Sequence, residues 1–151
     1  MQSESIKVLF TLTQDYAKEP KFGSEKAAGA DLHACIDPSS SVDIGPDETV
    51  KISVGIKTQI PDGYVGLVFA RSGIATKQDL APANKVGVID SDYRGEWFVA
   101  LHNHGRDIQR IFNGERIAQV IFVPIPSVEF IESELDETKR GEGGFGSTGI
   151  N

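Results

Sequence analysis

A carboxylate and an aromatic ring lie close together in the polar segment between Gly87 and Gly95. The segment separates two apolar runs, so it is predicted to be the turn of a hairpin, with Asp90 at the point where the first strand ends. A carboxylate held rigidly there can act as a general base toward a bound ligand, and the Tyr93 ring can stack against a sugar or a base. An ordinary Asp- and Ser-rich β-turn would explain the same residues.

Two further segments carry groups that bind phosphate. Arg71, Ser72 and Gly73 follow an apolar run and precede a predicted short helix. A guanidinium, a hydroxyl and the first backbone N–H groups of the helix can all donate to phosphate oxygens. A serine N-cap beside a solvated arginine is the alternative. Arg116 and Gln119 could also face phosphate, or could be the polar positions of a strand.

A glycine-rich tail, residues 140–149, offers Arg140 and Phe145 on a flexible backbone. It could close as a lid that lays the ring over a base and the guanidinium on a phosphate, with free backbone N–H groups around the anion. Plain disorder is the alternative. The tail is not a Walker A loop, because no Gly-Lys-Ser/Thr follows its glycines.

The histidines give weaker signals. His102 and His104 would share one face of a predicted strand and could form half of a metal site. No third ligand is evident nearby, which favours a structural role, because zinc sites need three protein ligands or more. His33 stands alone, and a solvated or hydrogen-bonded imidazole is expected there.

Alternating apolar residues predict that β-strands position these groups. The predicted strands are residues 6–12 and 50–60, each with one buried face, 97–101, and 117–123, buried on both sides. The turn signals between these runs suit a sandwich or a barrel. One short helix is expected over residues 72–80. The acidic and glycine-rich character after Pro126 predicts a mobile arm.

Composition limits the classes of partner. At 151 residues and 39% hydrophobic content, the chain suits one globular domain without disulfides or a structural metal. A net charge of -7 argues against nucleic acid and membrane surfaces as partners, but allows a small anion beside a few arginines. No run approaches the roughly 20 apolar residues of a membrane span, and residues 1–5 lack the features of a signal peptide. The single cysteine, Cys35, is interpreted as a small buried hydrophobe and fits a cytoplasmic location.

Taken together, five segments resemble, in order and spacing, the five motifs of the trimeric dUTPase family. The segments are residues 28–32, 71–73, 87–95, 114–119 and 140–149, and the similarity runs from residue 6 to residue 149. The resemblance implies an all-β fold, a distorted jelly-roll similar to a β-barrel, with one short helix and a flexible C-terminal arm. Residues 1–126 would form the β-domain with four motifs, and residues 127–151 the arm with the fifth.

The resemblance also implies a reaction, the Mg²⁺-assisted hydrolysis of dUTP to dUMP and pyrophosphate, which limits uracil in DNA and supplies dUMP for dTMP synthesis. Asp90 matches the general base that activates a water for attack on the α-phosphorus, and Tyr93 matches the ring that excludes a 2′-hydroxyl. Asp31 matches a residue that holds waters around Mg²⁺. The other positions that match substrate contacts are Arg71, Ser72, Gly73, Asn84, Gly87, Val88, Ile89, Arg116, Gln119, Arg140, Phe145, Gly146 and Ser147.

The resemblance further implies a homotrimer with shared active sites. Asp90 would come from one chain, Arg71 and Gln119 from a second, and Arg140 from the third. Ala70 departs from the pattern, because many members have proline there. Two alternatives stay open. A dCTP deaminase has the same fold but needs a carboxylate at the pyrimidine 4-position, and a nucleotide sensor would keep the fold without turnover.

Overall fold

A computed structural model describes residues 5–146 of the chain. Within these residues the chain forms 12 strands and one short helix, so the expected all-β class is confirmed. The helix is α1 (Ser72–Lys77). The strands are β1 (Leu9–Leu12), β2 (Lys21–Phe22), β3 (Ala30–His33), β4 (Ser41–Ile44), β5 (Thr49–Ser53), β6 (Ile56–Gln59), β7 (Tyr64–Phe69), β8 (Leu80–Pro82), β9 (Gly87–Ile89), β10 (Phe98–Asn103), β11 (Gln109–Phe112) and β12 (Arg116–Pro124).

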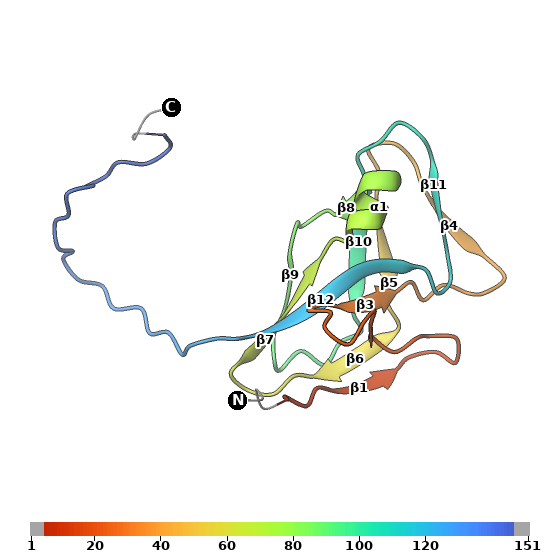
Figure 1. Cartoon of the computed structure of the whole chain (residues 1–151), viewed down its shortest axis with the longest axis horizontal. Helices are drawn as coiled ribbons and strands as arrows, with labels where there is room; N and C mark the ends of the chain where they lie inside the picture. The colour runs from red at the N-terminus through yellow and green to blue at the C-terminus, as the bar shows by residue number, and fades with distance from the viewer. Residues whose placement is uncertain (1–4, 147–151) are drawn as a thin grey trace.

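The strands pair into antiparallel sheets that contribute to one hydrophobic core (Figure 1). The largest sheet has the order β2-β3-β12-β7-β9, and the others are β5-β10-β8, β1-β6 and β11-β4. The core draws fully buried side chains from all four sheets, among them Leu32, Ile44, Ile56, Leu101, Ile111 and Ile117. Burial of these apolar groups is the main force that holds the sheets together. β9 is an edge strand, so one side of its backbone has no strand partner within the described residues.

The single strand predicted over residues 50–60 is wrong, because the structure breaks it at Gly55. β5 pairs with β10, whereas β6 pairs with β1. Gly55 has φ +70, and a Cβ there would lie 2.6 Å from Ala17 Cβ and 2.8 Å from Cys35 Sγ. Alternation conceals this break, because Val54 and Ile56 on either side are both buried. Cys35 itself is half-buried rather than buried.

Two predicted patterns of burial are also wrong. The apolar residues of β1 were expected to face a core, but Phe10 and Leu12 are 47% and 43% exposed in the single chain. β12 is buried on both sides only in its first half, where Ile117 and Ala118 are adjacent and fully covered, whereas residues 121–123 are half-buried. Both departures expose apolar surface of the single chain to solvent.

Helix α1 is shorter than predicted. It ends at Lys77, and Asp79 takes a left-handed conformation with φ 54 before Leu80 begins β8. Leu80 pairs with Asn103 of β10, so this residue, which the sequence pattern assigned to the helix, belongs to the sheet. The serine N-cap alternative is wrong as well. Arg71 occupies the N-cap position without a side-chain cap bond, and Ser72 is the first helical residue.

The C-terminal arm separates from the body after β12. Residues 125–146 form no strand or helix, and Figure 1 shows them running away from the sheets. Large apolar side chains on this part of the arm are open to solvent, namely Ile125, Val128, Phe130, Ile131, Leu135 and Phe145. No helix in the described part of the chain is long and apolar enough to cross a membrane.

Candidate active site

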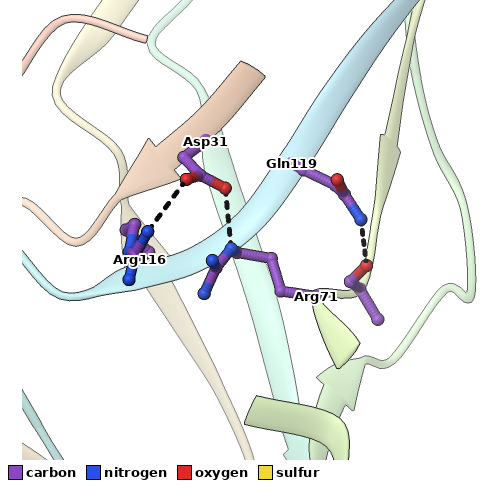
Figure 2. Close-up of polar contacts among 5 residues, drawn as sticks. Asp31, Arg71, Arg116 and Gln119 are labelled. Carbon is purple, nitrogen blue, oxygen red and sulfur yellow. Dashed lines mark hydrogen bonds and ion pairs between the residues drawn. The ribbon is translucent and has the colours of Figure 1, made fainter. Parts of the chain in front are cut away.

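A buried carboxylate organises the first group of predicted site residues. Asp31 lies on β3 with its side chain 12% exposed, and its Oδ1 accepts a hydrogen bond of 2.7 Å from Arg71 Nε. Its Oδ2 accepts a longer bond of 3.4 Å from Arg116 Nη1, so the carboxylate lies between two guanidinium groups (Figure 2). The two arginines thus supply hydrogen-bond donors to both oxygens of this poorly hydrated carboxylate.

A β-bulge explains how Arg116 and Gln119 come to the same face. Residues three apart on a regular strand point to opposite faces. The pairing of β12 with β3 shifts between Arg116 and Ala118, so that Arg116 lies opposite His33 and Gln119 opposite Asp31. Because Asp31 and His33 are two residues apart, they share a face, and the bulge brings both β12 side chains to it.

Gln119 joins this face to the start of the helix. Its Nε2 donates to the Ala70 carbonyl at 3.0 Å, beside Arg71 (Figure 2). Gly29 makes room for that side chain, since a Cβ there would lie 2.6 Å from Gln119 Oε1. The motif segments 28–32, 71–73 and 114–119 therefore meet in one place, as their predicted common role requires.

Arg71 and Arg116 border a polar hollow of about 490 Å³ that contains groups the sequence analysis missed. Lys18, His33 and Lys77 line it together with Arg71, Gly73 and Arg116. His33 was expected to be solvated or hydrogen-bonded, but its Nδ1 is buried and has no hydrogen-bond partner among the described residues. Burial, followed by the nearby Lys18 cation, lowers the pKa of His33. The alternation of Asp31 and His33 along one strand was the available signal for His33.

Asp90 lies elsewhere, at the C-terminal end of β9. The predicted hairpin is wrong in its pairing, because β9 pairs with β7 whereas β10, the next strand, pairs with β5 and β8. The turn itself is present, and Tyr93 N donates to Asp90 O at 3.2 Å. Asp90 is exposed and borders a second hollow of about 270 Å³, together with Val88, Tyr93 and Phe98.

The Tyr93 ring is held within this turn by its neighbours. Its hydroxyl donates to the Glu96 carbonyl at 3.0 Å. Gly95 permits the ring to fold back, since a Cβ there would lie 2.4 Å from the Tyr93 hydroxyl oxygen. The ring remains 43% exposed and can contact a ligand in the hollow.

The segment 84–89 presents backbone groups beside Asp90. Gly87 packs closely on β7, where a Cβ would lie 3.2 Å from Val68 Cβ. Asn84 and Val88 are exposed, and the turn before the strand is closed by a 2.8 Å bond from Val86 N to Asn84 O. Because β9 is an edge strand, its free N–H and C=O groups can bind the polar edge of a planar ligand.

The two hollows have no lining residue in common. No residue between 125 and 146, the described part of the arm, lines either hollow. Arg140 Nε donates to the nearby Gly143 carbonyl at 2.8 Å, and Phe145 is fully exposed with φ 49. Gly146 has φ 86, which glycine adopts readily, and Ser147 lies outside the described residues. The predicted site residues that the structure describes thus occupy three separate places in one chain.

His102 and His104 lie against each other, with ring centroids 4.4 Å apart. His102 Nδ1 is 2.8 Å from Thr49 Oγ1, and its Nε2 is 3.5 Å from Asp47 Oδ1. Between residues 5 and 146, no group of three or more His, Cys, Asp and Glu side chains is placed to hold a metal ion. These contacts join His102 on β10 to Thr49 on β5 and to Asp47 just before it, and the structural role of the histidine pair stays a prediction.

Comparison with known sequences identifies the family. The profile of the dUTPase family matches residues 15–149. A deoxyuridine 5'-triphosphate nucleotidohydrolase of Desulfitobacterium hafniense is 45% identical over 153 aligned residues, which cover all of both chains. The corresponding protein of Acinetobacter baumannii is 42% identical and covers 86% of this chain and 87% of its own. The chain belongs to the dUTPase family.

Solved dUTPase structures agree with this assignment and confirm the expected jelly-roll-like fold. A variant dUTPase of Staphylococcus bacteriophage 80alpha, solved with dUpNHpp, has a TM-score of 0.82 at 28% identity and covers 95% of this chain and 99% of that chain. A dUTPase from phage phi11 of S. aureus has a TM-score of 0.76 at 25% identity, with 87% and 99% coverage. The five motif segments therefore lie within a fold that dUTPases share.

Proposed function

We propose that this dUTPase hydrolyses dUTP to dUMP and pyrophosphate, with a water activated by Asp90 attacking the α-phosphorus. The observation that carries the proposal is the position of Asp90 in a chain of this family. Its carboxylate is exposed at the end of β9 and adjoins a hollow that also contains the Tyr93 ring. A carboxylate in that position can orient a water and accept its proton while a nucleoside occupies the hollow.

Selection of the base and sugar is assigned to the same hollow. The backbone of Gly87, Val88 and Ile89, with Asn84 before them, offers donors and acceptors from the free edge of β9 to the uracil edge. Close packing of Gly87 on Val68 supports a narrow slot. The Tyr93 ring, fixed through its hydroxyl, would pack on deoxyribose and exclude a 2′-hydroxyl by contact.

The triphosphate is assigned to the polar hollow beside α1. Arg71 uses its Nε for Asp31, and its two terminal nitrogens make no hydrogen bond within the described residues. They are available to phosphate oxygens, as are the Ser72 hydroxyl, the Gly73 N–H, Arg116 and Gln119. Converging cations would stabilise the charge that develops as the α-phosphorus is attacked.

We propose that Mg²⁺ binds with the triphosphate, near Asp31, the carboxylate that accepts from two arginines of this hollow, Arg71 and Arg116. Asp31 has both oxygens engaged by arginines, but each oxygen keeps a lone pair that can accept a hydrogen bond from a metal-bound water. Mg²⁺ is commonly held by substrate phosphates, waters and few carboxylates. When bound, the ion would neutralise phosphate charge and orient the triphosphate. Asp31 would hold its waters and would keep Arg71 in place.

We further propose that the active site is completed only in a homotrimer, with the arm as a mobile lid. The Asp90 hollow and the Arg71 hollow are separate in one chain, and the arm runs away from both. Exposed apolar side chains on the arm and on β1 favour contact with other chains, because monomers seldom leave such a surface open. Arg140, Phe145, Gly146 and Ser147 would then close over a neighbour's γ-phosphate and base. The cytoplasm remains the proposed location.

The test is pyrophosphate release from dUTP beside dCTP, dTTP and UTP, with and without Mg²⁺. We expect hydrolysis of dUTP alone, and only with the metal. Ammonia release from dCTP would instead identify a deaminase. Tight binding of dUTP without any turnover would identify a nucleotide sensor.

A further inference from the structure

The turn that carries Asp90 and Tyr93 crosses between two sheets. β9 lies in the five-stranded sheet and β10 in the three-stranded sheet, so no ladder between these two strands holds the connection. Its own backbone supplies only the 3.2 Å bond from Tyr93 N to Asp90 O among the described residues. A turn whose side chains must be placed to within a fraction of an ångström needs other support.

Arg94 supplies that support through a single nitrogen that contacts three carbonyls. Its Nη1 donates to Ser91 O at 2.7 Å and lies 3.4 Å from both Tyr93 O and Thr58 O. Ser91 and Tyr93 belong to the turn, whereas Thr58 is a buried residue of β6, in register with Phe10 of β1. The guanidinium therefore links the turn to a different sheet.

A second contact joins the other end of the turn to Thr13, which follows β1, the strand paired with β6. Thr13 Oγ1 donates to the Glu96 carboxylate at 2.5 Å, and Glu96 is the residue whose carbonyl accepts from the Tyr93 hydroxyl. After Glu96 the chain is held by backbone hydrogen bonds, the first from Trp97 N to Ile56 O at 2.9 Å. Between β9 and Trp97, Arg94 is thus the side chain that joins the Asp90 half of the turn to β6.

We propose that Arg94 is a positioning residue, which fixes Asp90 and the Tyr93 ring relative to the substrate without contacting it. This inference rests on the proposed dUTPase activity. A planar guanidinium can serve carbonyls on two segments at once, whereas a lysine ammonium is a compact donor on a flexible stem. Loss of Arg94 should let the turn shift, so that the base is misplaced and the ring excludes a 2′-hydroxyl less strictly.

The experiment compares Arg94→Ala and Arg94→Lys with the wild-type protein, and uses Arg110→Ala as the matched control. Arg110 is also an exposed arginine with well-formed bonds, Nε to Asp43 Oδ1 at 2.6 Å and Nη2 to Asp43 Oδ2 at 2.8 Å, but it lies on β11, outside the site. Each protein is assayed for kcat and KM with dUTP and with UTP. Hydrogen exchange of the peptide that contains residues 90–96 is measured without substrate, together with the thermal midpoint.

For Arg94→Ala we expect kcat for dUTP to fall by about 10- to 100-fold with little change in KM. The ratio of UTP to dUTP hydrolysis should rise, and exchange should quicken in residues 90–96 alone. Arg94→Lys should show the same changes to a smaller degree. If the alanine variant does not fold, the lysine variant alone tests the proposal. Arg110→Ala should match the wild type in all four readouts.

An Arg94 variant that loses activity on both substrates equally, with an unchanged ratio and unchanged exchange, would overturn the proposal, as would one with wild-type kinetics. Failure of the proposed function gives a different result, because the wild-type protein would then not hydrolyse dUTP. Hydrogen exchange of residues 90–96 in the Arg94 variants would still test the positioning role in that case. Exchange as slow as in the wild-type protein would refute that role.

Discussion

Two carboxylates of this chain differ in environment in a way that separates their roles. Asp31 is buried, and both of its oxygens accept from arginines, so its charge serves to hold Arg71 and Arg116. Asp90 is exposed, and its side chain makes no hydrogen bond within the described residues. Free lone pairs in a hollow of ligand size suit a group that must accept a proton from water. Asp90 is therefore the better candidate for the base.

At the residue scale, Asp90→Asn should remove most turnover and leave dUTP binding intact. The amide keeps the shape of the carboxylate but is not basic, so we expect kcat to fall by about 10² to 10⁴. Single-turnover kinetics and nucleotide binding by calorimetry measure the two effects separately. A variant with near-normal kcat would show that another group accepts the proton, and a variant that fails to bind dUTP would place Asp90 among the binding groups instead.

At the scale of elements, Gly55 decides whether residues 50–60 form one strand or two. Its left-handed φ of +70 and its contact with Ala17 and Cys35 allow the chain to leave the β5 sheet and enter the β6 sheet. An alternating apolar pattern does not register such a turn, because the buried face continues on both sides. The turn matters for the site, since β6 is the strand to which Arg94 ties the Asp90 turn.

Gly55→Ala is expected to destabilise the fold by about 2 to 4 kcal/mol, because the new Cβ is strained in φ and overlaps two neighbours. Gly63→Ala is the matched control. Gly63 has a similar φ of +82, but a Cβ there would meet nothing within 4 Å. Strain alone should cost about 1 kcal/mol at Gly63. Urea unfolding of both variants measures the difference, and equal losses of stability would show that packing at Gly55 is unimportant.

The arm is the second element with a prediction of its own. Removal of the residues after Lys139 should leave the thermal midpoint almost unchanged, because the described part of this segment contributes nothing to the core. Turnover of dUTP should nevertheless fall steeply, since in the proposed lid Arg140 and Phe145 reach the substrate only when the arm closes. Calorimetric melting and steady-state kinetics on the shortened chain check both statements. An unfolded product or a fully active one would contradict the role of a lid.

Alternating strand patterns predicted the all-β class, and the resemblance of five motif segments predicted the family, and both are confirmed. Period-two patterns report which face of a strand is apolar, but they do not report which strands pair. The exchange of partners after β9 and the bulge between Arg116 and Ala118 therefore escaped prediction. Arg94 escaped because its contact with Thr58 depends on how the strands are arranged, whereas His33 could have been found from its alternation with Asp31 along β3.

At the scale of the whole molecule, this acidic protein gathers cations around one hollow. The chain has a net charge of -7, yet the hollow beside α1 is lined by Lys18, Arg71, Lys77 and Arg116 with one carboxylate, Glu115. Local fields of this kind draw an anion to one place and leave the rest of the surface repulsive to polyanions. The separation of this hollow from Asp90 within one chain is the reason for proposing that sites are shared between chains.

The last prediction concerns that assembly and uses two inactive chains that can complement each other. One carries Asp90→Asn and keeps its arm, whereas the other keeps Asp90 and lacks the residues after Lys139. Each homotrimer alone should have almost no activity. In a homotrimer with shared sites, cyclic symmetry gives three equivalent sites, and a mixed trimer can place an intact Asp90 beside an intact arm from another chain.

Random mixing in equal amounts gives each site about one chance in two of an intact base and about one in two of an intact arm. We therefore expect about a quarter of wild-type activity if the two effects are independent. Refolding the two chains together and verifying mixed trimers by native mass spectrometry completes the measurement. If each site were built within one chain, no mixture could place a good base beside a good arm, and activity would stay at the level of the separate variants. Recovery in mixed trimers would therefore require that the arm of one chain acts on the Asp90 of another.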